Sequence, residues 1–150
     1  HLRMRFDMQA SAIEPDPRID AVRGAIAIER GPLVYAIEDH DVPAGLLIES
    51  LRVELPLDAS PVLRTQPGLP DGVLPLAVAV SAIEVPDTSW PYRPMHCGGH
   101  AAERQAPHEP LVVQAIPYFA WGNRQSTSMR VWLPSHLTDI APPSGLEKEI

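Results

Sequence analysis

The sequence predicts an all-β domain, either an antiparallel β-sandwich or a jelly roll. Eighteen of the 150 residues are proline, and because proline fixes φ and has no backbone N–H to donate, long helices cannot run between them. Apolar residues instead recur at every second position or in short runs bounded by turn residues, as they do in strands. No amphipathic stretch of helical length separates these runs, so a parallel βαβ architecture is not favoured.

Three strands are predicted in the N-terminal third of the chain. Apolar residues at every second position predict a strand over residues 2–9. The same alternation and a short apolar run predict strands over residues 25–30 and 33–38. Gly31 and Pro32, a flexible residue followed by a rigid one, predict a bulge or kink at which the chain bends between these two strands.

Four more strands and three loops follow from the same signals. The strands are expected at residues 48–55, 74–85, 111–118 and 129–133, with Pro75 at a strand start or a bulge. Proline, glycine and polar residues predict loops over residues 12–18, 56–71 and 90–110. We expect one β-domain over residues 1–137, followed by an extended C-terminal tail over residues 138–150.

The charge and the composition argue against several classes of partner. The net charge is −7, Lys148 is the only lysine and the eleven arginines are scattered along the chain, so the sequence predicts no clustered basic surface for nucleic acid. The longest apolar run, residues 73–80, is too short to span a bilayer. The single cysteine, Cys97, excludes an internal disulfide framework and an all-cysteine zinc site. The sequence does not assign a cellular compartment.

Three segments resemble a known family. They are residues 27–35 (AIERGPLVY), followed three residues later by Glu38, then residues 115–124 (AIPYFAWGNR) and residues 129–133 (MRVWL). In content, order and spacing they resemble the family 127 glycoside hydrolases, the β-L-arabinofuranosidase family, in the β-sandwich region that follows the catalytic barrel.

The resemblance implies a parent enzyme that hydrolyses terminal β-L-arabinofuranosides. In that family a zinc-bound cysteine is the nucleophile, and further cysteines and a glutamate hold the metal in an (α/α)6 barrel. One cysteine cannot supply such a site, so we assign no catalytic, cofactor-binding or metal-binding residue to this chain. Zinc is expected only in the parent catalytic domain.

Two clusters are candidates for reactive sites. His96, Cys97, His100 and His108 could offer zinc ligands, but a loop that binds nothing is the preferred interpretation. Among the carboxylates, two could form the acid and base pair of a glycosidase. The candidate carboxylates are Glu29, Glu38, Asp39 and Asp41. We interpret Glu29-Arg30 instead as an ion pair or backbone anchor, and residues 39–41 as a polar turn.

The aromatic segments supply the candidates for contact with a partner or a sugar. Strand alternation predicts that Tyr118 and Phe119 point to opposite faces, one to the core and one to an interface. Asn123 and Arg124 are expected in a structural turn, and the alternative is that Arg124 or Arg30 reaches the missing catalytic domain. The candidate interface or sugar-contact residues are Arg30, Tyr35, Tyr118, Trp121, Asn123 and Arg124.

The function expected from the sequence is that of a non-catalytic C-terminal β-sandwich domain. It would pack against the missing N-terminal catalytic domain or complete a homodimer. The first alternative is a carbohydrate-binding module that uses exposed aromatic side chains. The second is an unrelated interaction domain.

Overall fold

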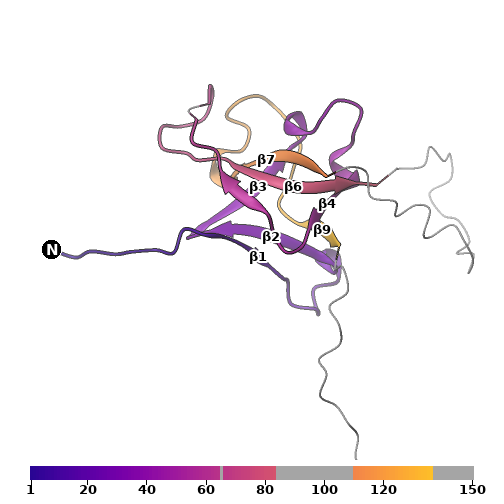
Figure 1. Ribbon diagram of the computed structural model, residues 1–150, viewed down its shortest axis with the longest axis horizontal. Coiled ribbons are helices and arrows are strands. Elements are labelled where there is room, and N and C mark those ends of the chain that lie inside the picture. The colour runs from indigo at the N-terminus through magenta and orange to yellow at the C-terminus, as the bar shows by residue number, and fades with distance from the viewer. Residues whose placement is uncertain (65, 84–109, 137–150) are drawn as a thin grey trace, which may run out of the picture.

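The protein is described here by a computed structural model that covers residues 1–64, 66–83 and 110–136. It is all-β, as predicted (Figure 1). The four 3-10 helices within these ranges are three residues long each: η1 (Asp20–Val22), η2 (Asp39–Asp41), η3 (Ile48–Ser50) and η4 (Tyr118–Ala120). The strands described are β1 (Ala10–Ile13), β2 (Ala25–Arg30), β3 (Leu33–Glu38), β4 (Leu51–Glu54), β5 (Ala59–Pro61), β6 (Leu76–Ala82), β7 (Leu111–Pro117), β8 (Met129–Arg130) and β9 (Leu133–His136).

Six of these strands close into a barrel. Their order is β2-β9-β4-β6-β7-β3, and the pairing of β3 with β2 completes the circuit. Closure depends on β2, which pairs with β9 through Ala25 and Ile26 and with β3 through residues 28–30. The circuit is antiparallel except where β4 and β9 run parallel. The finer prediction of a β-sandwich or jelly roll is therefore not confirmed, because one continuous circuit replaces two separate sheets. Both architectures produce the same alternation in sequence, so the pattern could not separate them.

The interior of the barrel is filled by alternate residues of the six strands. Because successive side chains of a strand point to opposite faces, every second residue of each strand faces the barrel interior. Burying each of these large side chains contributes about 1.5–3 kcal/mol. The inward set is Ile26, Ile28, Tyr35, Ile37, Leu51, Val53, Leu76, Val78, Val80, Ala82, Val113, Ala115 and Leu133.

Most predicted strands are present. β2 and β3 have the bounds that were predicted, and β6 and β7 lie inside their predicted ranges. The predicted strand at 48–55 is divided into η3 and β4, and β5 lies within a predicted loop.

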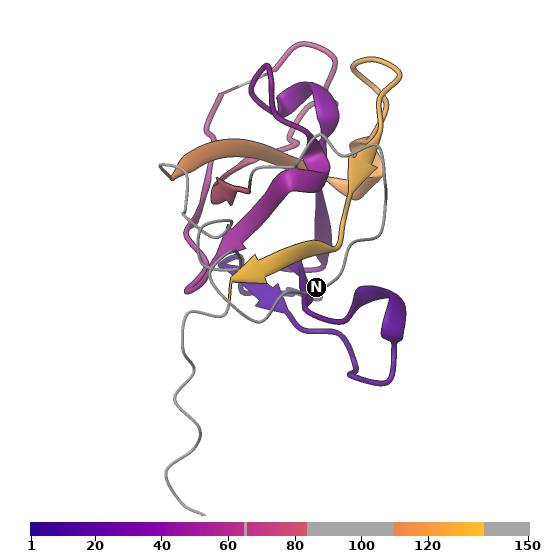
Figure 2. The same ribbon diagram turned by 90° about the vertical axis from the view of Figure 1, so that its right-hand side faces the viewer.

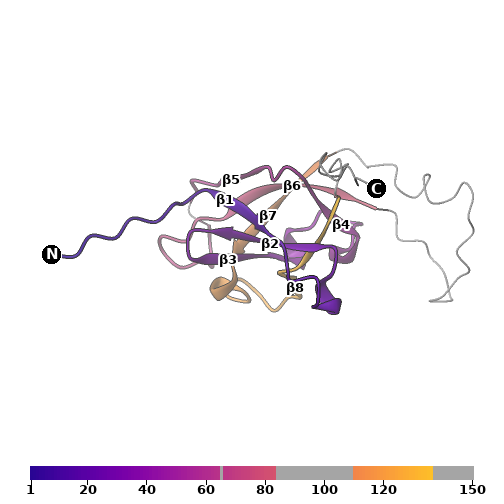
Figure 3. The same ribbon diagram turned by 90° about the horizontal axis from the view of Figure 1, so that it is seen from below.

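The strand predicted over residues 2–9 is wrong for this domain. The first strand, β1, begins only at Ala10, which pairs with Arg30, the last residue of β2. Residues before Ala10 therefore have no part of β2 left to pair with, and they extend away from the barrel in Figures 1 and 3.

The bend predicted at Gly31 and Pro32 is a hairpin turn, not a bulge. Arg30 pairs with Leu33 across it, which leaves the two central residues as the loop. Gly31 has φ of 58°, and a positive φ at the first central residue followed by a negative φ, which proline enforces, is the requirement of a type II′ turn. This turn fixes the register of β2 and β3.

Some predictions fall outside the described residues. They include the Cys97 loop with its histidines, most of the predicted loop at 90–110, and the tail at 138–150. Within the described ranges, no helix has the length and apolar character needed to cross a membrane.

Candidate functional site

The outer face of β3 and β7 is covered by the segment that follows β7. Ala36 pairs with Ile116 across these two strands, and both are buried although they do not belong to the interior cluster. Glu38 lies on the same outer face and is fully buried. The covering segment is η4 with the loop that leads to β8; Figure 2 shows this loop in light orange, rising beside β8.

Glu38, Asp41 and Arg124 hold this loop in place, and we call them the arginine clamp. The backbone N–H of Gly122 donates to Oε1 of Glu38 at 2.9 Å, and Arg124 Nε donates to Oε2 of Glu38 at 3.0 Å. Arg124 Nη1 donates to Oδ1 of Asp41 at 3.0 Å, and Nη2 bonds both carboxylates. One guanidinium thus joins the end of β3, the η2 turn and the covering loop.

The clamp keeps Arg124 charged. Burial of the guanidinium lowers its pKa, but hydrogen bonds to Asp41 and Glu38 and the charges of both carboxylates outweigh this, so the pKa of Arg124 is raised above its ordinary value. A raised arginine pKa leaves the group protonated over the whole range in which a protein is folded. The clamp is therefore not opened by deprotonation of its cation.

Gly68 packs directly on the stem of Arg124. Its φ is 82°, and a Cβ placed there would lie 3.0 Å from Arg124 Cγ and 3.1 Å from Arg124 Cα. We expect Gly68→Ala to lower the free energy of unfolding by about 2–5 kcal/mol, the sum of left-handed strain and overpacking. Urea denaturation measures the change.

Gly72 gives a matched control for this prediction. Its φ is 81°, but a Cβ there meets nothing within 4 Å, so Gly72→Ala should cost only about 1–2 kcal/mol, the backbone strain. Equal losses in the two variants would contradict the packing of Gly68 on Arg124.

A metal site at the clamp does not fit the geometry. Candidate ligand atoms of Glu38, His40 and Asp41 lie within 4.8 Å of one another, but both carboxylates already bind the Arg124 guanidinium. His40 Nε2 is 3.4 Å from Oε2 of Glu38, and neither ring nitrogen has a hydrogen-bond partner among the described residues. The zinc that the resemblance implies needs cysteine ligands, and the described ranges contain no cysteine, so the described residues do not fit that metal.

Three large aromatic side chains are exposed on the clamped loop, and we call them the aromatic patch. Tyr118, Phe119 and Trp121 are 47%, 60% and 43% exposed. The rings of Tyr118 and Trp121 stack with centroids 6.4 Å apart and planes 15° apart, and Trp121 Nε1 donates to the carbonyl of Thr127 at 3.2 Å. The prediction that Tyr118 and Phe119 point to opposite faces, one inward, is wrong. β7 ends at Pro117 and η4 follows, so strand alternation no longer applies.

The other candidates are placed as follows. Tyr35 is in the barrel interior and donates its hydroxyl to the carbonyl of Leu74 at 3.0 Å. Asn123 is exposed beside the clamp. Arg30 is half-buried at the end of β2, and its Nε has no partner among the described residues. Arg124 is bonded inside the domain.

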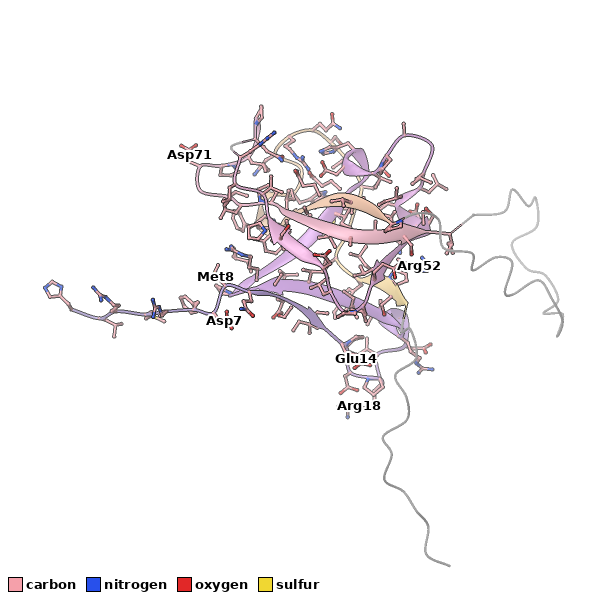
Figure 4. The ribbon with its side chains drawn as sticks, in the orientation of Figure 1. Asp7, Met8, Glu14, Arg18, Arg52 and Asp71 are labelled. Carbon is pink, nitrogen blue, oxygen red and sulfur yellow. The ribbon has the colours of Figure 1, made fainter. Side chains whose placement is uncertain are left out.

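The described hollows do not bring acidic side chains together. One is lined in part by Asp71 and the other by Glu14, each the single carboxylate of its lining. Figure 4 shows Asp71 above the barrel and Glu14 below it. The carboxylates that do converge are Glu38 and Asp41, and Arg124 occupies them both. Neither the hollows nor the clamp therefore provides two free carboxyl groups that could flank a glycosidic bond as acid and base.

The closed barrel with its clamped outer loop defines a small all-β domain. The chain belongs to the family described as the glycoside hydrolase family 127 C-terminal domain, whose model matches residues 10–134. This confirms the resemblance on residues 27–35, 115–124 and 129–133.

The relatives are much longer proteins. The chain is 26% identical to the non-reducing end β-L-arabinofuranosidase of Bifidobacterium longum subsp. longum, and the match covers 87% of this chain and 19% of that protein. A solved glycoside hydrolase matches with a TM-score of 0.69 and 26% identity, over 86% of this chain and 20% of that one. A GH127 β-L-arabinofuranosidase from Geobacillus stearothermophilus T6 shares the fold, with a TM-score of 0.64 and 23% identity over 86% of this chain and 18% of its own. The chain thus spans about a fifth of the relatives that it matches.

Proposed function

We propose that this chain is a non-catalytic accessory domain of a family 127 β-L-arabinofuranosidase, and that it docks on the catalytic part of the same enzyme through the aromatic patch. The B. longum relative is named as an enzyme that acts on β-L-arabinofuranosides, which gives the proposed parent activity. In this proposal the reacting groups, with the zinc implied by the resemblance, belong to the catalytic part.

The anchored aromatic patch carries the proposal. Its three side chains expose roughly 300 Å² together, given 150–250 Å² for each ring system. A contiguous patch of this size is comparable with the largest on a typical monomer and is often functional. Because Gly122 and Arg124 fix the loop to buried Glu38, the patch is ordered before any partner arrives. Docking then costs little additional entropy.

We expect the triple variant Tyr118→Ser, Phe119→Ser, Trp121→Ser to weaken docking in the full-length gene product. Removing this apolar surface should lower the Tm of the full-length protein by at least about 3 °C. The isolated chain should lose less, because the three residues are about half exposed there and only the Tyr118–Trp121 stack and the Trp121–Thr127 hydrogen bond are lost. Differential scanning calorimetry of both proteins measures the difference.

Leu63→Ser is the control, because Leu63 is 82% exposed and is not part of the aromatic patch. This variant should change the Tm of neither the full-length protein nor the isolated chain. A triple variant that lowers the Tm of the isolated chain as much as that of the full-length protein would contradict docking through the patch. Loss of a dimer instead would identify a second subunit as the partner.

The nearly parallel rings of Tyr118 and Trp121 favour a second candidate, a carbohydrate-binding module. Planes 15° apart on an exposed loop offer apolar faces to sugar rings. Titration of arabinose-containing oligosaccharides into the isolated chain, followed by tryptophan fluorescence, separates the candidates. A saturable change that the triple variant abolishes would support sugar binding, whereas a domain that only docks gives none.

A further inference from the structure

The segment of residues 2–8 has the pattern of a half-buried strand but no sheet to join in this domain. Charged residues alternate here with four apolar ones, Leu2, Met4, Phe6 and Met8. This is the pattern of a strand with one face buried and one face exposed to solvent. The apolar side chains are 90%, 67%, 53% and 38% exposed, in that order. Exposed apolar residues at every second position are what a missing partner sheet would cover.

The barrel cannot supply that partner. β1 begins at Ala10, which pairs with Arg30, the last residue of β2. The chain then turns at Gly31, so β2 has no further residues with which residues 2–8 could pair. Met8 and Asp7 cross over Gly31, where a Cβ would lie 2.5 Å from Met8 Sδ. Figure 4 shows both residues at the base of the projecting segment. In the described ranges no backbone hydrogen bond connects residues 1–8 to a strand.

We propose that residues 2–8 add as an edge strand to a β-sheet in the part of the full-length protein that precedes this domain. This rests on the proposed function, because it needs the larger enzyme. Main-chain hydrogen bonds to the open edge supply the pairing, and the sheet's buried face covers the apolar side chains. Arg3, Arg5 and Asp7 then lie on the solvent face.

Two observations favour this partner. The family model for the C-terminal domain begins at residue 10, so residues 2–8 lie outside the domain that the family shares. The relatives are about five times as long as the part that matches this chain. A C-terminal domain, as the matched family is described, follows the other domains of such a protein.

Hydrogen-exchange mass spectrometry of the peptide that covers residues 2–8 tests the proposal. We expect exchange in the full-length gene product to be at least about tenfold slower than in the isolated chain, because pairing protects the amides. Met4→Ser with Phe6→Ser should restore fast exchange in the full-length protein. Arg3→Ser with Arg5→Ser, the same change on the opposite face, should leave the exchange slow.

Three results would overturn the proposal. They are equally fast exchange in both proteins, equal effects of the two double variants, and a dimer of the isolated chain in sedimentation velocity that Met4→Ser with Phe6→Ser dissociates. The aromatic triple variant is measured in parallel. If it still lowers the Tm of the full-length protein while residues 2–8 exchange fast, only the strand proposal fails. If it has no effect either, the docking proposal fails with it.

Discussion

Arg124→Met is expected to lower the free energy of unfolding of the isolated chain by about 3–5 kcal/mol, because it leaves a buried carboxylate without its cation. Glu38 is fully buried, and Arg124 bonds it through both Nε and Nη2. Methionine fills similar volume but cannot neutralise the charge. Urea denaturation followed by circular dichroism measures the loss, which would remove a large part of the stability of a domain of this size.

Two companion variants decide the cause. Glu38→Gln combined with Arg124→Met should recover more than half of the loss, since glutamine is uncharged and still accepts from Gly122 N–H. Arg23→Met breaks an exposed ion pair with Asp20 and should leave the midpoint unchanged within error. If the double variant is as unstable as Arg124→Met, the loss of stability comes mainly from the lost packing of the arginine stem and not from the unpaired charge of Glu38.

Ile37→Ala is expected to cost about 2–5 kcal/mol, the loss of buried methyl groups together with the cavity that remains. Ile37 is 0% exposed and faces the barrel interior from β3. In a closed barrel, strands surround this side chain on all sides, so the cavity cannot collapse easily. Chemical denaturation gives the change in free energy.

Val112→Ala is the control for the interior, because Val112 is an exposed residue of β7. It should change stability by less than about 0.5 kcal/mol. If Ile37→Ala were equally harmless, the interior assignment of β3 would be wrong.

The sequence predicted the elements whose neighbours are close along the chain. β2 and β3 have their predicted bounds because alternating apolar residues flank Gly31 and Pro32, and a two-residue turn pairs what lies on either side. The segment at residues 2–9 misled the prediction, since its alternation contains no information about which sheet it joins. The closure of the barrel depends on pairings between distant strands, which alternation does not encode.

The arginine clamp could not be predicted from spacing, because Glu38 and Arg124 are 86 residues apart. The sequence offered Glu38 only as a candidate acid or base and Arg124 only as a candidate interface or sugar-contact residue, and nothing local joins the two. The exposed patch had a usable signal. Pro117 ends β7 and Gly122 has a positive φ of 75°, so these two residues mark a turn that brings the aromatic side chains out of the strand.

The pairing of Ile26 with Leu133 determines when the domain can fold. β2 can pair with β1 and β3 early, but the barrel cannot close before β9, the last strand of the described residues, has been synthesised, so a nascent chain keeps part of the barrel interior uncovered until then. Such distant pairing is typical of domains that fold in milliseconds to seconds rather than microseconds. The interval gives chaperones time to act, and it makes premature termination before β9 a route to misfolding rather than to a smaller folded product.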